Sequence, residues 1–355
     1  MKLIELHILQ SFPVSCLNRD DVGSPKTAMF GGVSRARISS QSLKRAIREY
    51  AQKNLPNARF GGERTKLIVQ PLADALTKHG VAEAKVALEY AKNIADKLAT
   101  LDSKAKEPKV STLIFLAPSE IDAIASQVAA LLRANAKSKD YEKSLDKFCK
   151  QADLLDGADI AIFGRMVASL PSLTLEGAAM FSHALSTHKA DNDLDFYSAV
   201  DDLKPKGDDA GAGMIGTLEF SSAVYYRYAA VNLDLLADAD HLGKLSVQER
   251  RMVVDAFIRA TLMAVPGARK NSMNAHTLPG CVLGIFKSAG QPVQLINAFE
   301  TPVCSKSGLL DSSVEAMQAH HAQLKEIWGI TCDTELILPK VNLNAFCEGL
   351  TQYVV

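Results

Sequence analysis

The chain has 355 residues, of which 47% are hydrophobic, and its 40 Lys/Arg and 40 Asp/Glu give a formal net charge of zero. That length predicts one large domain or two, and the balanced charge argues against a protein that is basic over its whole surface. Six scattered cysteines without a CxxC pair argue against a zinc site and against a disulfide framework.

Signals for targeting, membranes and cofactors are also missing from the sequence. Met1 and Lys2 lead directly into an alternating strand pattern instead of a signal peptide, and no apolar run is long enough to cross a bilayer. We therefore expect a cytoplasmic protein that does not contact membranes. The GxGxxG, P-loop, GxSxG and HExxH motifs are absent, and the eight histidines fall in no metal-ligand spacing apart from the adjacent pair His320-His321, so we expect no cofactor and no metal.

The charge is distributed unevenly along the chain. Residues 11–60 contain nine Lys/Arg and three acids, whereas residues 191–220 contain eight acids and two lysines. This segregation favours a protein that binds a polyanion with one surface and its own neighbours with another.

Residues 2–10 alternate in polarity, with Ile4, Leu6 and Ile8 on one side and Glu5 and His7 on the other. This pattern predicts a half-buried strand. His7 is a candidate catalytic residue, although a lone histidine in a strand is more often structural.

The irregular segment 11–30 follows, with Pro13, Gly23 and Pro25, and it carries Arg19 and Lys26. Because this polar loop precedes a strongly basic stretch, it would allow one groove to be lined from two sides.

Residues 31–50 form that basic stretch, which we interpret as a loop that runs into a helix. Gly31 and Gly32 allow backbone conformations that side chains forbid. Arg35 and Arg37 alternate with apolar residues, so in an extended segment both guanidinium groups would point the same way. Ser39 or Ser40 is a good N-cap.

The helix itself combines an apolar face with a polar and basic one. The apolar face is formed by Leu43, Ala46, Ile47 and Tyr50, and the other face by Gln41, Lys44, Arg45 and Arg48. A helix N-terminus with hydroxyls, an amide and cations around it suits a phosphodiester backbone. A solvated surface helix with an ordinary serine cap explains the same spacing.

Residues 61–157 are rich in Ala, Leu and Lys and predict a helical insertion, with helices over 63–79, 82–99, 120–136 and 140–154. Ser119 and Asp122 resemble a capping box. Basic residues are spread over this insertion, either as solubility charges or as weak, sequence-independent contacts to nucleic acid: Lys104, Lys106, Lys109, Arg133, Lys137, Lys139, Lys143 and Lys147.

Strand patterns return at residues 159–163, 177–187 and 218–230. Arg165 and Met166 end the first of them, and this methionine is either core filler or an apolar wedge between bases. The acidic, glycine-rich segment 190–217 predicts a long hairpin arm. Phe196 and Tyr197 at its base could pack in a core or stack on a base. Asp191 opens a pattern similar to a calcium loop, but Phe196 stands where that loop requires glycine, which excludes calcium.

The remaining elements predict a clear amphipathic helix over 246–263, strands over 281–285 and 293–296, and a helix over 311–328 capped by Asp311 or Ser312. The loop after the first of these helices is a second glycine-containing basic loop and carries Arg269 and Lys270. No set of residues assembles a convincing nucleophile, base and orienting group.

Seven segments together resemble a known family. They are Ser15-Cys16-Leu17-Asn18-Arg19-Asp20-Asp21, Phe30-Gly31-Gly32, the run from Arg37 to Ala46, Ile162-Phe163-Gly164-Arg165-Met166, Ala199-Val200-Asp201-Asp202-Leu203, Glu219-Phe220-Ser221-Ser222 and Val265-Pro266-Gly267-Ala268. In this order they are similar to the CasC backbone subunits of the type I-E CRISPR surveillance complex, Cascade.

The resemblance implies an α+β fold shaped like a right hand. A modified ferredoxin-like (RRM-like) palm would comprise residues 1–60, 158–189 and 218–355, a helical fingers insertion residues 61–157, and a β-hairpin thumb residues 190–217. Copies of such a subunit stack head to tail along one CRISPR RNA, with other Cascade subunits and the target DNA as further partners, and each thumb kinks the guide so that a base flips out.

The resemblance also implies residue roles. Arg19, Lys26, Ser39, Gln41, Lys44, Arg45 and Arg48 would hold the guide backbone, Met166 would wedge at the kink, Phe196 and Tyr197 would lie near the flipped base, and Arg269 and Lys270 are weaker matches. With the neighbouring basic and polar residues Arg35, Arg37, Ser40 and Arg165, these form the expected RNA-binding set.

Two alternatives remain at this point. The first is an endoribonuclease on the same scaffold that processes precursor RNA, with His7 or His183 in general acid–base roles. The second is a protein–protein adaptor whose basic patch meets an acidic partner. The favoured interpretation is a non-catalytic scaffold, because guide sequences vary and phosphate contacts do not depend on sequence.

Overall fold

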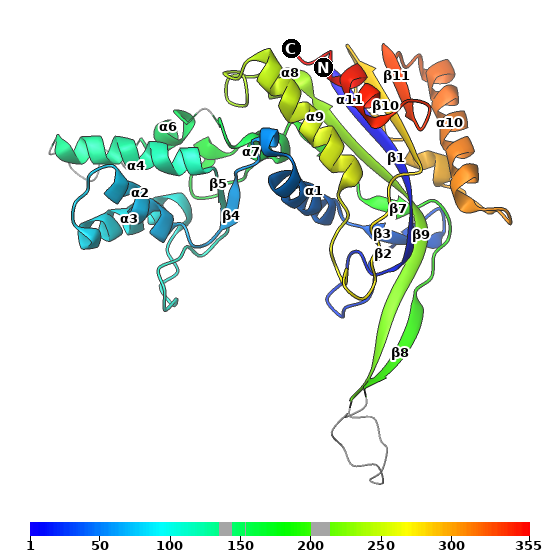
Figure 1. Ribbon diagram of the computed structural model, residues 1–355, viewed down its shortest axis with the longest axis horizontal. Coiled ribbons are helices and arrows are strands. Elements are labelled where there is room, and N and C mark those ends of the chain that lie inside the picture. The colour runs from blue at the N-terminus through cyan, green and yellow to red at the C-terminus, as the bar shows by residue number, and fades with distance from the viewer. Residues whose placement is uncertain (135–143, 153, 200–213) are drawn as a thin grey trace, which may run out of the picture.

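The computed structural model describes residues 1–134, 144–152, 154–199 and 214–355. At its centre lies a nine-stranded sheet in the order β11-β10-β1-β9-β7-β3-β2, in which β6 and β8 also pair with β9 (Figure 1). All pairs between these described strands are antiparallel. The strands are β1 Leu3–Ser15, β2 Thr27–Phe30, β3 Val33–Ile38, β6 Ala179–Phe181, β7 Ala184–Ser186, β8 Asp193–Ala199, β9 Met214–Asn232, β10 Cys281–Lys287 and β11 Thr334–Leu338.

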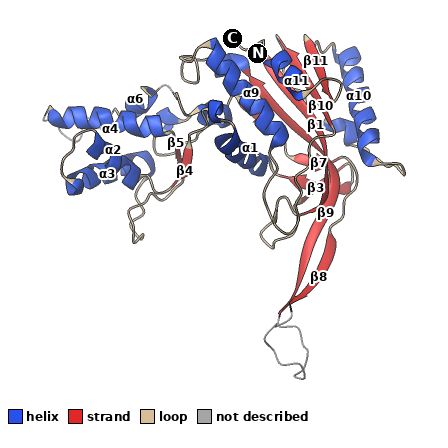
Figure 2. Ribbon diagram, viewed as in Figure 1, coloured by secondary structure: helices blue, strands red, loops and turns tan. Residues whose placement is uncertain are grey.

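Helices cover both faces of this sheet (Figure 2). One face carries α1 Ser40–Asn54, α9 Val247–Met263 and α11 Leu343–Thr351, and the other carries α10 Leu309–Trp328 with the 3-10 turn η3 Ile296–Phe299. The chain passes through β1, α1, β6, β9, α9 and β10 in that order, while the strands lie side by side as β10-β1-β9-β6. The protein is therefore an α+β fold around an antiparallel sheet.

Residues 61–157 form a separate, mainly helical lobe. It lies beside the sheet at the left of Figure 1. It contains β4 Glu63–Thr65, α2 Val69–Lys78, α3 Ala84–Ala99, β5 Ile114–Leu116, α4 Pro118–Arg133 and α6 Leu145–Lys150. Its buried Leu, Ile and Ala side chains form their own hydrophobic cluster. Shorter elements join the regions: η1 Pro56–Ala58, α7 Ala158–Phe163, η2 Pro171–Leu173 and α8 Leu233–Leu236.

Strand β1 is buried on both sides, so the expectation of a half-buried strand is wrong. Ile4, Leu6 and Ile8 pack beneath α9 and α11, as the alternation predicts. The opposite side is covered by α10, and Glu5 and His7 are buried there among hydrogen-bond partners. A polar residue in an alternating strand is therefore buried when a second helical layer satisfies it.

Three further elements differ from the sequence expectations. Residues 158–163 form helix α7 instead of a strand; almost every residue in this short run is buried, and such an apolar run does not distinguish helix from strand. Residues 177–187 divide into β6 and β7, and in the expected strand over 293–296 the first three residues are irregular and Ile296 begins η3.

Several helices begin or end at other residues than the sequence predicts. Helix α10 begins at Leu309 after Gly308, and neither Asp311 nor Ser312 caps it. The expected capping box is formed by other residues, because the Glu120 carboxylate accepts from the Ala117 N–H at 2.9 Å. The sequence predicts a helix over 63–79, whereas the first residues of this range form strand β4. Residues 135–143 and 153, which include Lys137, Lys139 and Lys143 and parts of the expected helices over 120–136 and 140–154, lie outside the described part.

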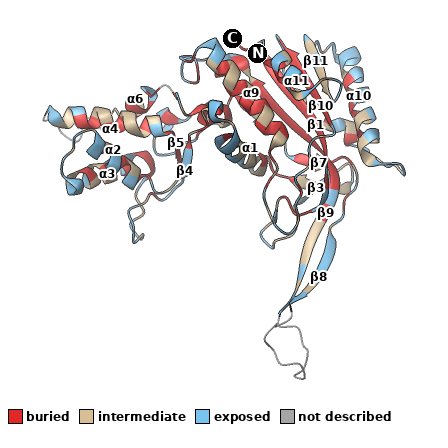
Figure 3. Cartoon of the chain, in the orientation of Figure 1, coloured by how far each residue is buried: buried red, intermediate tan, exposed pale blue. Residues whose placement is uncertain are grey.

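The hairpin of β8 and β9 extends from the lower end of the sheet, where both strands leave the core and become exposed (Figure 3). Residues 200–213, the expected glycine-rich tip, lie outside the described residues. Among the helices that the structure describes, none has the length and apolar character needed to cross a membrane.

Candidate nucleic-acid interface

The N-terminus of α1 is fixed by contacts from three parts of the chain. Of the two predicted caps, Ser39 is the N-cap, and its Oγ accepts from the Ser42 N–H at 3.3 Å. Asn18 accepts from the Ser39 N–H at 2.9 Å, and His183 Nδ1 accepts from the Ser40 N–H at 3.3 Å. Leu43 and Ile47 are buried and anchor the helix to the sheet. The helix start is thereby held rigidly between two loops.

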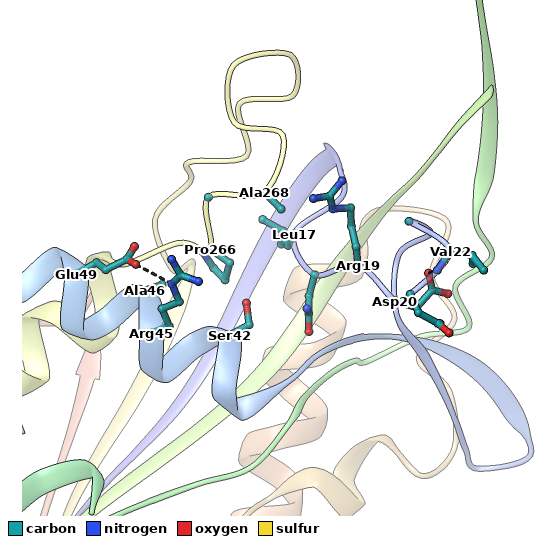
Figure 4. Close-up of a pocket in the computed structure, with 14 residues that line it drawn as sticks. Leu17, Arg19, Asp20, Val22, Ser42, Arg45, Ala46, Glu49, Pro266 and Ala268 are labelled. Atoms are coloured by element: carbon teal, nitrogen blue, oxygen red, sulfur yellow. Dashed lines mark hydrogen bonds and ion pairs between the residues drawn. The ribbon is translucent and has the colours of Figure 1, made fainter. Parts of the chain in front are cut away.

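A cleft of about 700 Å³ opens beside this helix start (Figure 4). The polar face of α1 forms one wall, and residues 17–23 with the segment Pro266-Gly267-Ala268 form the rest. The prediction of a groove lined by separate chain segments is confirmed. The lining residues are Leu17, Asn18, Arg19, Asp20, Asp21, Val22, Gly23, Ser42, Arg45, Ala46, Glu49, Pro266, Gly267 and Ala268.

Two exposed arginines supply the positive charge of the cleft. Arg45 is 77% exposed and pairs with Glu49 one turn further along α1, at 2.7 Å between Nε and Oε1. Arg19 is exposed on the loop that Asp20 stabilises by accepting from the N–H groups of Val22 and Ser24. A pair as exposed as Arg45–Glu49 is weak, so Arg45 remains available to an anionic ligand.

A second pair of basic residues, Lys26 and Arg37, lies next to the N-terminus of α1. Arg37 on β3 donates to the Thr27 carbonyl at 3.1 Å, and both Arg37 and Lys26 act on His183. Partial burial lowers the pKa of His183, and these two positive charges lower it further. An imidazole nitrogen that accepts a hydrogen bond carries no proton, so the lowered pKa agrees with the role of Nδ1 as acceptor. Gln41 is exposed on the first turn of the same helix, and Ser40 is half-buried beside it.

The opposite side of α1 carries a third group. Lys44 Nζ lies 5.3 Å from the centre of the Phe181 ring, while Arg48 and Arg64 lie 5.1 Å and 5.0 Å from the centre of the Phe115 ring. Burial lowers the pKa of both Lys44 and Arg48. Arg64 was not among the residues predicted from the sequence. It follows the Gly61-Gly62 pair by two positions, similar to the basic residues that follow Gly31-Gly32, and this pattern could have indicated it.

Arg48 also faces a buried carboxylate. Its Nε lies 4.0 Å from Asp159 Oδ2, and neither atom has a hydrogen-bond partner among the described residues. Asp159 Oδ1 accepts from the Gly62 N–H, which links α7 to the start of the helical lobe. Burial raises the pKa of Asp159 to about 6, although Arg48 opposes this shift. Arg48 is thus only partly available to a ligand.

Arg35 is fully buried, which corrects its place in the expected RNA-binding set. Its guanidinium donates to the backbone carbonyls of Phe30, Ser186, Phe299 and Glu300. Gly31 belongs to the same junction: its φ is +61°, and a Cβ there would lie 1.7 Å from the Glu300 carbonyl oxygen. Arg35 therefore joins β3 to distant loops and does not reach a ligand.

Arg165 is a second correction. Its side chain is 5% exposed and pairs with Glu120, which is 1% exposed, at 2.7 Å between Nη1 and Oε1. It also donates to the carbonyls of Leu173 and Phe115. Burial raises the pKa of Glu120, and the positive charge of Arg165 counteracts that shift. This pair ties α4 to the segment after α7 and leaves no free guanidinium. Ser39 is also buried and contributes through the helix cap.

The three apolar residues expected to contact bases, Met166, Phe196 and Tyr197, differ in how far they are exposed. Met166 directly follows buried Arg165 and is 83% exposed. Phe196 on β8 is 64% exposed, whereas Tyr197 on the other side of the strand is half-buried and packs over Gly216, where a Cβ would lie 2.5 Å from the ring. The free ring of this hairpin is therefore Phe196.

The second basic loop adds one exposed cation near the cleft. It begins directly after the cleft-lining segment 266–268. Arg269 has a φ of +53° and is half-buried, with its charge acting on Cys16, whereas Lys270 is exposed. The structure thus brings Arg19, Arg45 and this loop to one cleft, and Lys26 and Arg37 to the adjoining helix start.

Comparison with known proteins gives the family. A model of the CT1975-like protein family matches residues 4–346. The chain belongs to this family. It is also similar to a chain of a solved structure described as a CRISPR RNA-guided surveillance complex, pre-nicking, with 28% identity and a TM-score of 0.80, covering 99% of this chain and 100% of that one.

A chain of a second structure, described as a CRISPR RNA-guided surveillance complex, is similar over 97% of this CT1975-like protein and 94% of its own length, with 26% identity and a TM-score of 0.65. Both likenesses extend over the sheet, the lobe and the hairpin regions together. A search of curated proteins finds no match.

Proposed function

We propose that this CT1975-like protein is a non-catalytic subunit that binds CRISPR RNA and forms the backbone of a surveillance complex of the type I-E Cascade kind. The family and the two similar structures support membership of such a complex. The subtype rests on the sequence motifs of residues 15–46, 162–166 and 265–268.

The cleft at the α1 N-terminus carries the proposal. Arg19 and Arg45 expose two guanidinium groups, and Lys26 and Arg37 add two further cations at the helix start. The N-terminus of α1 adds the positive end of the helix dipole, although the N–H groups of Ser40 and Ser42 are already bonded within the chain. Arginine and lysine side chains bind phosphate oxygens whatever the base sequence, which is what a subunit needs when the guide sequence varies.

The remaining parts of the chain have complementary roles in this proposal. The order β1-α1-β6-β9-α9-β10 matches the βαββαβ connectivity of a ferredoxin-like palm, with the lobe of residues 61–157 as fingers and the hairpin of residues 190–217 as thumb. Met166 would wedge at the kink of the guide, and Phe196 would stack on the displaced base.

Assembly along the guide uses surfaces of opposite charge. The described base of the hairpin exposes the acids Asp191, Asp193 and Asp195, whereas the region around the α1 N-terminus carries Arg19, Lys26, Arg37 and Arg45, with Asp20, Asp21 and Glu49 also lining its cleft. A contact between the hairpin of one copy and the basic side of the next is heterologous and does not close, so it produces an open helix of subunits. Target DNA and the other Cascade subunits would join this filament.

The endoribonuclease alternative loses one of its two candidates. His7 is buried beneath α10, where its Nδ1 lies 2.9 Å from the Tyr226 hydroxyl, and burial lowers its pKa well below the usual value. It cannot contact an RNA at the surface. His183 is exposed, so His183→Ala is the variant that tests cleavage: incubation of the pure protein with repeat RNA should give no site-specific product with or without this histidine.

The binding test compares paired substitutions on the full chain. Arg19→Ala with Arg45→Ala should weaken binding to two labelled RNAs of unrelated sequence by the same factor and reduce the magnitude of the salt slope by about 1.4, for two phosphates released from single-stranded RNA. Lys53→Ala with Lys340→Ala is the matched control, since both lysines are exposed and Lys53 lies at the other end of α1. Weakening confined to one RNA sequence, or equal weakening by the control, would contradict the proposal.

A further inference from the structure

A small cluster of metal-binding residue types lies on the far side of the sheet from the α1 cleft. His321 comes from α10, Cys332 from the loop that follows this helix, and Glu335 from the edge strand β11, which lies beside α10 at the right of Figure 1. One ligand atom from each of the three residues lies within 4.8 Å of the other two. Separate elements therefore converge here without any CxxC or HExxH spacing in the sequence.

The imidazole of His321 provides the second observation. The His321 side chain is 11% exposed, and its Nε2 makes no hydrogen bond of regular geometry in the described structure. That nitrogen lies 3.4 Å from Glu335 Oε1, on the side where Cys332 is also found. At this distance the contact with Glu335 is weak, and a ligand that binds the nitrogen directly would satisfy it better.

The other two ligands are held in place by their neighbours. Asp333, next to Cys332, accepts from the Ser288 N–H at 2.6 Å and from the Ser288 hydroxyl at 3.0 Å, which fixes the loop against β10. Glu335 lies within the β10–β11 ladder, opposite Ile285. A cavity of about 530 Å³ borders His321 and Glu335, so solvent can reach these two side chains.

We propose that His321, Cys332 and Glu335 form a zinc site. One thiolate, one imidazole and one carboxylate are the donor types of Zn²⁺, and three protein ligands with water complete a tetrahedron. Sulfur and nitrogen donors disfavour the hard cations Mg²⁺ and Ca²⁺. On binding, the Cys332 thiol releases its proton to solvent, and zinc joins α10 to the edge strand β11.

Lys325 is the group that zinc would displace. Its ammonium lies 2.6 Å from Glu335 Oε1, in the position where it neutralises this carboxylate in the absence of a metal. A divalent cation at the cluster would replace this ammonium, and the exposed lysine side chain would turn toward solvent. Removing the lysine charge should therefore favour metal binding.

The test is a titration of the purified, metal-free full chain with Co²⁺ as spectroscopic probe, followed by Zn²⁺ competition with a chromophoric chelator. We expect one metal per chain, a thiolate-to-cobalt charge-transfer band, and Zn²⁺ binding weakened by about 100-fold or more in Cys332→Ala and Glu335→Gln. Lys325→Gln should bind Zn²⁺ more tightly than the original chain.

Matched controls separate this cluster from adventitious binding. His320→Gln changes the adjacent histidine of α10, and Cys304→Ser removes an exposed thiol elsewhere, so neither should change the affinity. The proposal is overturned if no charge-transfer band forms, or if the band persists in Cys332→Ala. Because the readout uses no RNA, its result is independent of the guide-binding proposal.

Discussion

The cleft beside α1 and the junction between sheet and lobe both contain an arginine–carboxylate pair with 2.7 Å between nitrogen and oxygen. In the cleft, Arg45 and Glu49 are 77% and 49% exposed. At the junction, Arg165 and Glu120 are 5% and 1% exposed. Equal distances therefore describe two different situations, because water solvates the first pair and is excluded from the second.

This difference shows why a basic residue near a motif is not by itself a ligand-binding residue. A buried pair is costly to break, since the remaining charge has neither water nor partner, whereas an exposed pair exchanges easily with solvent or with a phosphate. Arg165 and Arg35 therefore stabilise the fold. Arg45 and Arg19 remain accessible to solvent and to a ligand. Arg48, half-buried against Asp159, lies between these two extremes.

The largest effect is expected at the buried pair. Arg165→Met should lower the free energy of unfolding by about 3–5 kcal/mol, because Glu120 is left as an unpaired buried carboxylate. Urea denaturation followed by circular dichroism measures this change. Adding Glu120→Gln, which removes the charge, should restore most of the loss. A single variant as stable as the original chain would show that the junction pair behaves like the exposed one.

The half-buried contact between Arg48 and Asp159 predicts that the free energy of unfolding depends on pH. Burial raises the pKa of Asp159 to about 6, so the folded protein binds more protons than the unfolded chain between about pH 4 and pH 6. Stability contributed by this group is therefore present at low pH and decreases as the pH rises through that window. Relative to Asp159→Asn, the original chain should lose up to about 3 kcal/mol between pH 4 and pH 7.

Urea denaturation of both proteins at several pH values isolates this term, since the other titrating groups contribute equally to each. The Asn variant retains an oxygen that can accept from the Gly62 N–H, so the fold should be preserved. A difference between the two proteins that stays constant with pH would mean that Arg48 keeps Asp159 ionised.

The smallest effect on stability is expected in the cleft. Arg45→Ala should change the free energy of unfolding by less than about 0.5 kcal/mol, because its pair with Glu49 is exposed. The same variant should nevertheless weaken RNA binding, measured by fluorescence anisotropy. Glu49→Ala is the matched control: it breaks the same pair but should strengthen RNA binding. Equal weakening by both variants would indicate that the pair positions α1 and that Arg45 does not contact the RNA.

Local signals in the sequence were sufficient for several elements. The Ser39-Ser40 pair followed by an apolar repeat predicted helix α1 with a serine cap, and the periodicity over 246–263 predicted α9. The Ala- and Leu-rich composition of residues 61–157 predicted a helical insertion. These features succeed because caps and periodic faces depend on residues within a few positions of one another.

The tertiary structure decided which charged groups are buried, and this information lies outside any local window. The carbonyls that bind Arg35 belong to residues 186, 299 and 300 as well as to nearby Phe30, and the partner of Arg165 is 45 positions away. The same holds for helix α7 and for the cluster of His321, Cys332 and Glu335. The sequence alone determined where positive charge occurs and where α1 and α9 begin. Only the packing of distant segments determined which of those charges water can reach, because burial depends on everything that surrounds a side chain.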